Sequence, residues 1–181
     1  MTTYVALLRG INVGGRKKVP MAQLREILGG LGWTGVRTYL NSGNAVFAAP
    51  ETDPAELAAR LEKAVAGHFG FDVDCFVIDG PYLRRVVDVC PFPAEELSGK
   101  QLHVSFLSGE PSAEKFGEVD TGAFLPEEFR LGELAYYLYA PSGLGVSKLA
   151  VELGRTKYVK GLTVTSRNWN TVQALLEMSA G

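Results

Sequence analysis

The apolar residues of this chain are spaced in two ways, one typical of strands and one typical of helices. In the first half, four short apolar runs predict β-strands at 4–9, 36–40, 45–49 and 71–78. Between them, residues 20–31 and 54–69 place apolar side chains three and four positions apart, which is the spacing of amphipathic helices. The predicted order of elements is therefore β-α-β-β-α-β.

Residues with special backbone preferences mark the borders of these elements. Residues 41–44, Asn-Ser-Gly-Asn, stand between two apolar runs and have the chemistry of a tight hairpin turn. Asp53 is expected to cap the second helix, with Pro54 at its first position.

The second half of the chain repeats this order. Its predicted elements lie at 101–107, 112–116, 128–131, 134–140, 144–153 and 162–165, with a last helix at 169–178. The pattern predicts the α/β (α+β) class, with two duplicated ferredoxin-like β-α-β-β-α-β halves and a C-terminal helix. We place the halves at 1–92 and 101–181, because the proline, charges and glycine of 93–100 are typical of a connection.

Composition narrows the class of protein. The chain has 181 residues, of which 46% are hydrophobic, so it can bury a sizeable core. A net charge of −2 argues against binding of nucleic acid by bulk charge, and such binding would have to be local. Neither a secretory signal nor a membrane-spanning run is recognisable, which predicts a cytoplasmic protein without a membrane partner. The sequence predicts no oligomeric state.

The first candidate site is the loop that follows the first strand, residues 9–18. It carries four cations and three glycines, and Pro20 then opens a helix. Glycines let backbone N–H groups turn toward an anion, and a helix start adds further donors. The loop matches neither of the two common nucleotide-binding motifs, so it predicts an anion site of another kind. The alternative is a tight connection with solvated lysines.

The second candidate site is the start of the last helix, SRNWNTV at residues 166–172. Arg167 precedes a turn rich in hydrogen-bonding side chains, next to the positive end of a helix dipole. Two helix starts that favour anions predict one shared anion-binding site. The alternative is structural: Asn168 caps the helix, Trp169 fills the core, and Arg167 pairs with an acidic neighbour.

The sequence contains no recognisable catalytic or metal-binding constellation. His68 and His103 lack a serine, cysteine or acid in a triad-like arrangement, and packing is the favoured interpretation of both. Cys75 and Cys90 are too few and too far apart for a zinc motif. We therefore expect no metal and no cofactor, and the sequence leaves open whether the protein is an enzyme.

Three motifs together carry a resemblance to a known family. They are LLRGINVGG followed by VPM, then TYLNSGNAVF, and finally SRNWNTV. With them the chain resembles the bacterial family known as domain of unknown function 1697. The resemblance implies a duplicated ferredoxin-like fold and no established biochemical activity. The family pattern carries onto Arg9, Asn12, Gly14, Gly15, Asn41, Ser42, Gly43, Asn44, Arg167, Asn168, Trp169, Asn170 and Thr171.

These observations favour a protein that binds a small phosphorylated or carboxylated ligand in a cleft between the glycine-rich loop and the SRNWNTV motif. The predicted ligand-binding residues are Arg9, Asn12, Gly14, Gly15, Lys17, Asn41, Ser42, Asn44, Arg167, Asn168, Asn170 and Thr171. The three residues of the hairpin turn in this set are also explained as turn formers.

Two alternatives stay open. One is nucleic-acid binding along a track of cations that consists of Arg16, Lys17, Lys18, Lys148, Arg155, Lys157, Lys160 and Arg167. Tyr136, Tyr137 and Tyr139 alternate on a predicted strand and suit base stacking, although packing between the halves is the favoured account of them. The other alternative is an interaction scaffold without any ligand.

Overall fold

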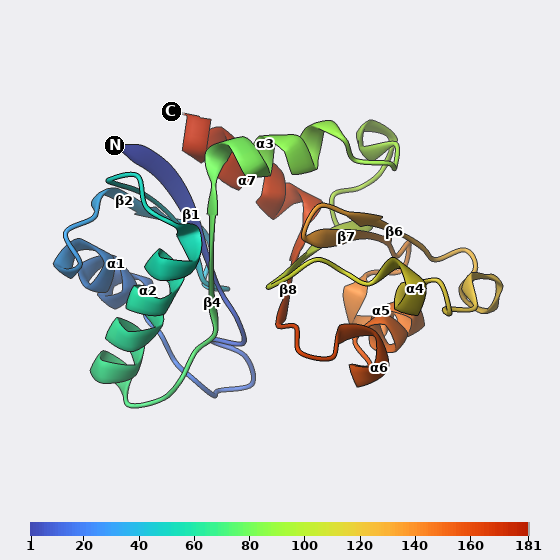
Figure 1. The fold of residues 1–181 in the computed structure, drawn as a ribbon, viewed down its shortest axis with the longest axis horizontal. Coiled ribbons are helices and arrows are strands. Elements are labelled where there is room, and N and C mark those ends of the chain that lie inside the picture. The colour runs from blue at the N-terminus through green and yellow to red at the C-terminus, as the bar shows by residue number, and fades with distance from the viewer. Residues whose placement is uncertain (181) are drawn as a thin grey trace. The chain divides into compact units, whose positions relative to one another are not determined.

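In the computed structural model, which describes residues 1–180, the chain divides into two compact units. The first unit contains residues 1–85 and 174–180, and the second contains residues 86–173. Figure 1 shows both units with most of their helices and strands labelled. Each unit has its own four-stranded antiparallel sheet.

The first unit follows the predicted order of elements. They are β1 (Thr2–Leu8), α1 (Met21–Gly30), β2 (Thr34–Thr38), β3 (Asn44–Ala49), α2 (Pro54–Phe69) and β4 (Cys75–Asp79). The strand order is β2-β3-β1-β4, so β1 has a partner on each side. Asp53 caps α2 as predicted, because its Oδ1 accepts the N–H of Ala55 at 2.9 Å.

The second unit repeats this arrangement with shorter helices. Its elements are η1 (Ala94–Glu96), β5 (Leu102–Leu107), α4 (Ala113–Phe116), η2 (Thr121–Phe124), β6 (Glu128–Gly132), β7 (Ala135–Tyr139), η3 (Leu144–Val146), α5 (Lys148–Leu153), α6 (Thr156–Val159) and β8 (Val164–Asn168). The order β6-β7-β5-β8 matches that of the first sheet, position by position. The predicted fold, two ferredoxin-like halves, is confirmed.

Two predicted elements of the second half differ in the structure. The single helix expected at 144–153 is divided into η3 and α5, because the Oγ of Ser147 accepts the N–H of Ala150 and starts a new helix. The strand expected at 162–165 instead spans Val164–Asn168, so part of the SRNWNTV motif is strand.

The borders of the compact units also differ from the predicted ranges 1–92 and 101–181. The first border falls inside α3 (Gly80–Asp88), between Arg85 and Val86, and the last border falls inside α7 (Trp169–Ala180). Residues 174–180 therefore group with the first unit. Prolines and charges in the sequence mark a loop, but a continuous helix can leave one compact unit and enter the other without any such marker.

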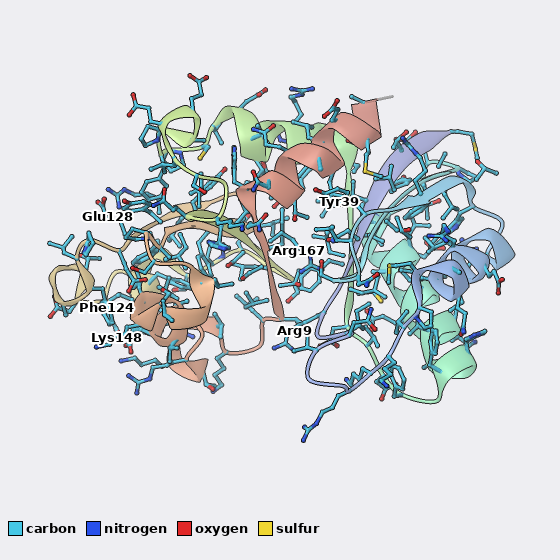
Figure 2. The ribbon with its side chains drawn as sticks, turned by 180° about the vertical axis from the view of Figure 1, so that it is seen from behind. Arg9, Tyr39, Phe124, Glu128, Lys148 and Arg167 are labelled. Atoms are coloured by element: carbon cyan, nitrogen blue, oxygen red, sulfur yellow. The ribbon has the colours of Figure 1, made fainter. Side chains whose placement is uncertain are left out.

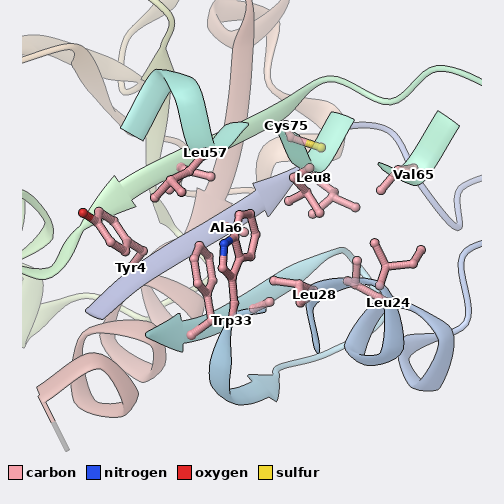
Figure 3. Close-up of a cluster of buried hydrophobic side chains, with 14 of the residues drawn as sticks. Tyr4, Ala6, Leu8, Leu24, Leu28, Trp33, Leu57, Val65 and Cys75 are labelled. Atoms are coloured by element: carbon pink, nitrogen blue, oxygen red, sulfur yellow. The ribbon is translucent and has the colours of Figure 1, made fainter. Parts of the chain in front are cut away.

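Helices α1 and α2 cover one face of the first sheet. Figure 3 labels buried side chains of this cluster: Tyr4, Ala6, Leu8, Leu24, Leu28, Trp33, Leu57, Val65 and Cys75. The ring of Trp33 stacks on that of Phe47, with centroids 4.2 Å apart. The alternate residues of β1, Val5 and Leu7, are buried as well. Because β1 is buried on both faces from Tyr4 to Leu8, this part of the strand is an unbroken apolar run.

The second unit has a core of its own. Its aromatic centre is Phe116, whose ring lies 5.8 Å from the rings of Tyr136 and Tyr158. Tyr137 is buried too, and its hydroxyl donates to the main-chain oxygen of Val86 at 2.5 Å. Tyr136 and Tyr137 therefore present no exposed platform for stacking bases. Within residues 1–180, every helix is too short or too polar to cross a lipid bilayer.

Candidate functional site

The glycine-rich loop begins where the central strand β1 ends. The N–H of Leu8 donates to the main-chain oxygen of Gly43 at 2.8 Å, and the N–H of Arg9 donates to that of Asp74 at 2.9 Å. The loop therefore starts between the hairpin turn that precedes β3 and the segment that precedes β4. All three segments belong to the first unit and meet at one end of its sheet.

Asn12 holds this loop in shape. Its side-chain oxygen accepts the N–H of Val19 at 2.8 Å, and its Nδ2 donates to the main-chain oxygens of Val19 (3.0 Å) and Asn41 (2.6 Å). Its backbone φ is +55°, in the left-handed region that Asn tolerates better than most residues. The Asn12 side chain is thus used to fix the loop and join it to the hairpin turn.

The tip of the loop is a tight turn. The N–H of Arg16 donates to the main-chain oxygen of Val13 at 3.1 Å. Gly14 and Gly15, between them, have φ values of +61° and +72°. Two adjacent positive φ values are typical of a type I′ turn and favour glycine. The glycines therefore build a protruding turn in which Val13 and Arg16 are exposed.

The hairpin turn at 41–44 is shaped by its own side chains. Asn44 is fully buried, and its Nδ2 donates to the main-chain oxygen of Tyr39 and to Ser42 Oγ, both at 2.9 Å. Gly43 has a φ of +93° and packs so closely that a Cβ there would lie 2.8 Å from two side-chain atoms. Asn41 and Ser42 are exposed. These contacts support the turn-forming role of this segment.

The four cations of the loop differ in their partners. The Nη1 of Arg9 lies 3.5 Å from Asp74 Oδ2, and 54% of each side chain is exposed. The Nζ of Lys17 donates to the main-chain oxygen of Asp72 at 2.6 Å. Within residues 1–180, the exposed side chains of Arg16 and Lys18 make no hydrogen bond or ion pair.

Nearby carboxylates reduce the net positive charge of this region. Besides Asp72 and Asp74, Glu62 lies nearby on α2. Burial raises the pKa of Glu62, a hydrogen bond from the Cys75 backbone opposes this, and the charges of Asp74 and Asp72 raise the pKa further. An incoming anion would be repelled by these groups and would have to compete with Asp74 for the Arg9 guanidinium.

In the SRNWNTV motif, the structural interpretation accounts for several side chains. Arg167 lies within β8 and is 8% exposed, and its Nη1 donates to Thr165 Oγ1 (2.7 Å) and to the main-chain oxygen of Ser166 (2.9 Å). Burial lowers the pKa of Arg167 to about 10. Asn168 Oδ1 accepts the N–H of Thr171 at 3.0 Å, so Asn168 caps α7.

The next residues of this motif pack against the connection before β5. The N–H of Trp169 donates to the main-chain oxygen of Gly99 at 3.1 Å. A side chain at position 99 would collide with that of Asn170. Glycine at position 99 therefore makes room for Asn170 at the start of α7, within the second unit.

Known proteins resemble this chain in sequence and in fold. A family model described as "Protein of unknown function (DUF1697)" matches residues 1–137. The chain belongs to the DUF1697 family. This confirms the family predicted from the motifs; the match contains the first two motifs and ends before SRNWNTV. No curated protein matches the DUF1697 chain.

A solved structure with the same fold is the conserved bacterial protein SP0830 from Streptococcus pneumoniae. It is 24% identical in sequence, the similarity covers 98% of each chain, and the TM-score is 0.73. At this identity the likeness establishes the fold of the DUF1697 chain.

The structure joins two of the three motifs within the first unit. The loop 9–18 and the turn 41–44 are linked through Asn12, whereas residues 166–172 fall in the second unit. The pairing of Arg9 with Asp74 leaves no signal in the sequence, because these residues are 65 positions apart and exposed acids are common. Within residues 1–180, no three His, Cys, Asp or Glu side chains are grouped so as to hold a metal ion.

Proposed function

We propose that residues 9–18 of the first unit, the cationic loop, bind a small phosphorylated or carboxylated ligand. The observation that carries the proposal is that exposed cations lie on a loop whose backbone is already fixed by Asn12. A ligand would therefore meet the cations without first having to order the loop, which lowers the entropic cost of binding.

The chemistry of the cations suits an anion with more than one oxygen. The guanidinium groups of Arg9 and Arg16 each present a planar set of donors that can bind two oxygens at once, and Lys18 adds a third charge. Arg16 and Lys18 have side chains without a partner within the described residues, so binding requires no existing contact of theirs to break. Arg9 would exchange Asp74 for the ligand.

The proposal rests on the first unit alone. Ligand binding by the SRNWNTV motif, through Arg167, Asn168, Asn170 and Thr171, stays a prediction. The hydrogen bonds of Arg167 and Asn168 within the second unit favour a structural role for both side chains.

A thermal-shift screen with nucleotides, sugar phosphates and small carboxylates tests the proposal, followed by titration calorimetry of any stabilising compound. The double variant Arg16→Ala/Lys18→Ala should bind at least about tenfold more weakly, because charge-assisted hydrogen bonds contribute ~1.5–3 kcal/mol each. Asp74→Asn should bind more tightly, since it removes a carboxylate charge that repels the ligand and competes with it for Arg9.

The matched control is Arg84→Ala, which also removes an exposed cation from the first unit. Arg84 lies near the first residues of β1, whereas the cationic loop follows the last residue of this strand. This variant should bind as the wild type does. The proposal is wrong if no compound of a broad panel stabilises the wild type, or if the double variant and the control respond alike.

Nucleic-acid binding is the second candidate, favoured by the same unpartnered side chains of Arg16 and Lys18. Fluorescence polarisation with short RNA and DNA strands separates the two functions. Binding through phosphates would weaken with salt, with a slope of about −0.7 per contact in log affinity against log salt for a single strand. Absence of binding at low salt excludes this candidate.

A cytoplasmic location is part of the proposal. Cell fractionation with antibodies against the untagged protein tests it, and recovery in the membrane pellet would contradict it.

A further inference from the structure

The second unit contains a pocket that involves none of the predicted ligand-binding residues. Its volume is about 290 Å³, and two segments line it. The first segment is 123–127, after the start of η2, and the second is 141–148, of which 141–143 and 146–148 line the pocket and Lys148 begins α5. Figure 2 labels Phe124 from the first segment and Lys148 from the second. All of these residues belong to one unit, so the pocket is independent of the cationic loop and of the function proposed for it.

Hydrogen bonds tie the two walls of the pocket together. The Oγ of Ser147 donates to Oε2 of Glu127, and the N–H of Leu149 donates to Oε1 of Glu127 at 3.4 Å. Gln101, which does not line the pocket, holds the start of the second segment, because its Nε2 donates to the main-chain oxygen of Pro141 at 3.2 Å. The pocket therefore has a defined shape before any ligand enters.

Two opposite charges lie in the lining without forming a pair. Glu127 and Lys148 both line the pocket, yet within residues 1–180 neither forms an ion pair. The carboxylate of Glu127 accepts two hydrogen bonds and has about four lone-pair sites, so it can accept further donors. The ammonium of Lys148 is exposed and has three donors to offer.

Apolar side chains complete the lining. Leu125 is 65% exposed and Val146 is 70% exposed, one on each segment, and Phe124 packs against the core of the second unit. An apolar group that covers these side chains would remove their surface from water, which is favourable in proportion to the area covered.

The volume limits the size of the ligand. A water molecule occupies about 30 Å³ in the liquid, so a pocket of about 290 Å³ holds roughly ten waters, or a ligand with a similar number of non-hydrogen atoms. A single amino acid fits this space.

From these observations we infer that the pocket binds a free α-amino acid with an apolar side chain. The ammonium group of the ligand binds Glu127, its carboxylate binds Lys148, and its side chain covers Leu125 and Val146. A zwitterion is favoured over a simple anion or cation, because only a zwitterion satisfies both charged residues of the lining.

Titration calorimetry and ligand-observed NMR with three matched compounds test this inference on the full chain. L-leucine carries both charges, 4-methylpentanoate lacks the ammonium group, and 3-methylbutylamine lacks the carboxylate. Leucine should bind at least about tenfold more tightly than either analogue, since each analogue leaves one charged residue of the pocket without a partner. Equal binding of leucine and the carboxylate, or no binding of leucine at millimolar concentration, overturns the inference.

Variants locate the binding in the pocket. Lys148→Met should weaken leucine binding by about tenfold or more, and so should Glu127→Gln. The amide oxygen of the glutamine can still accept a hydrogen bond from Ser147 or from the N–H of Leu149. Lys160→Met is the control, because Lys160 belongs to the same unit and does not line the pocket.

Folding of each variant is verified by its circular dichroism spectrum and melting temperature. If Glu127→Gln loses its structure, the comparison of leucine with its two analogues on the wild type still decides the question. Unchanged binding in a folded Lys148→Met variant contradicts the inference. The cationic loop variant Arg16→Ala/Lys18→Ala should bind leucine normally, so the two proposals fail or hold independently.

Discussion

The side-chain amide of Asn12 donates to the main-chain oxygen of Asn41, 2.6 Å away, and so joins two motifs that are 29 residues apart in the chain. Both residues are polar and exposed, and both were predicted to contact a ligand. In the structure Asn12 instead connects the glycine-rich loop to the hairpin turn, and its N–H donates to the main-chain oxygen of Lys17 at 3.1 Å.

We expect Asn12→Ala to lower the free energy of unfolding by about 2 kcal/mol, because Val19 and Asn41 lose three hydrogen bonds and alanine tolerates the positive φ poorly. Asn41→Ala should cost less than about 0.5 kcal/mol, since the bond to Asn12 uses its main-chain oxygen, which alanine keeps. Urea unfolding measures both. Equal costs would show that the side chain of Asn41 matters as much as that of Asn12.

The two glycines at positions 43 and 14 should respond differently to alanine. Gly43→Ala places a Cβ 2.8 Å from side-chain atoms of Leu8 and Ile11 and also requires a φ of +93°, so a loss of more than about 2 kcal/mol is expected. At Gly14 the space is open and only the φ of +61° is unfavourable, so about 1 kcal/mol is expected. The ranking, read from urea midpoints, is the test. A larger loss at Gly14 would contradict the close packing of Gly43.

His103 should make the protein sensitive to acid. It is 5% exposed, its Nδ1 has no hydrogen-bond partner within the described residues, and its cross-strand neighbours Leu138 and Asn168 are uncharged. Burial lowers the pKa of His103, so below about pH 6.5 the unfolded chain binds a proton that the folded protein does not. Stability from this residue is present above that pH and is lost as the pH falls toward the lowered pKa.

Unfolding of wild type and His103→Leu between pH 5 and 8 would measure this effect. The wild type should lose at most about 1.4 kcal/mol more per pH unit than the variant below pH 6.5. Parallel stability curves would show that the pKa of His103 is the same in the folded and the unfolded chain.

Tyr137→Phe should destabilise the second unit. The variant removes the hydroxyl that donates to the main-chain oxygen of Val86 at 2.5 Å and leaves that buried oxygen without this donor. A cost of about 1–3 kcal/mol is expected. Burial also raises the pKa of Tyr137 to about 12, so absorbance titration should detect one fewer late-titrating tyrosine in the variant. An unchanged free energy of unfolding would show that the hydrogen bond contributes nothing net.

Much of the fold could be predicted because it is encoded locally. Apolar spacing gave β1 and α2, and the Asp53-Pro54 pair gave the start of α2, since a cap acts on residues two or three positions away. The prediction was wrong for the helix at 144–153. There Ser147 interrupts an apolar pattern that by itself fits one continuous helix.

By itself, the sequence determined the order of strands and helices, the duplication and the family, because periodicity, caps and turn residues act between near neighbours. The tertiary structure decided which polar residues are free to act. The side chain of Asn12 makes hydrogen bonds with Val19 and Asn41, and Arg167 is buried on β8. Glu127 and Lys148 line the same pocket. Their roles depend on contacts between residues far apart in the chain, which a linear pattern does not contain.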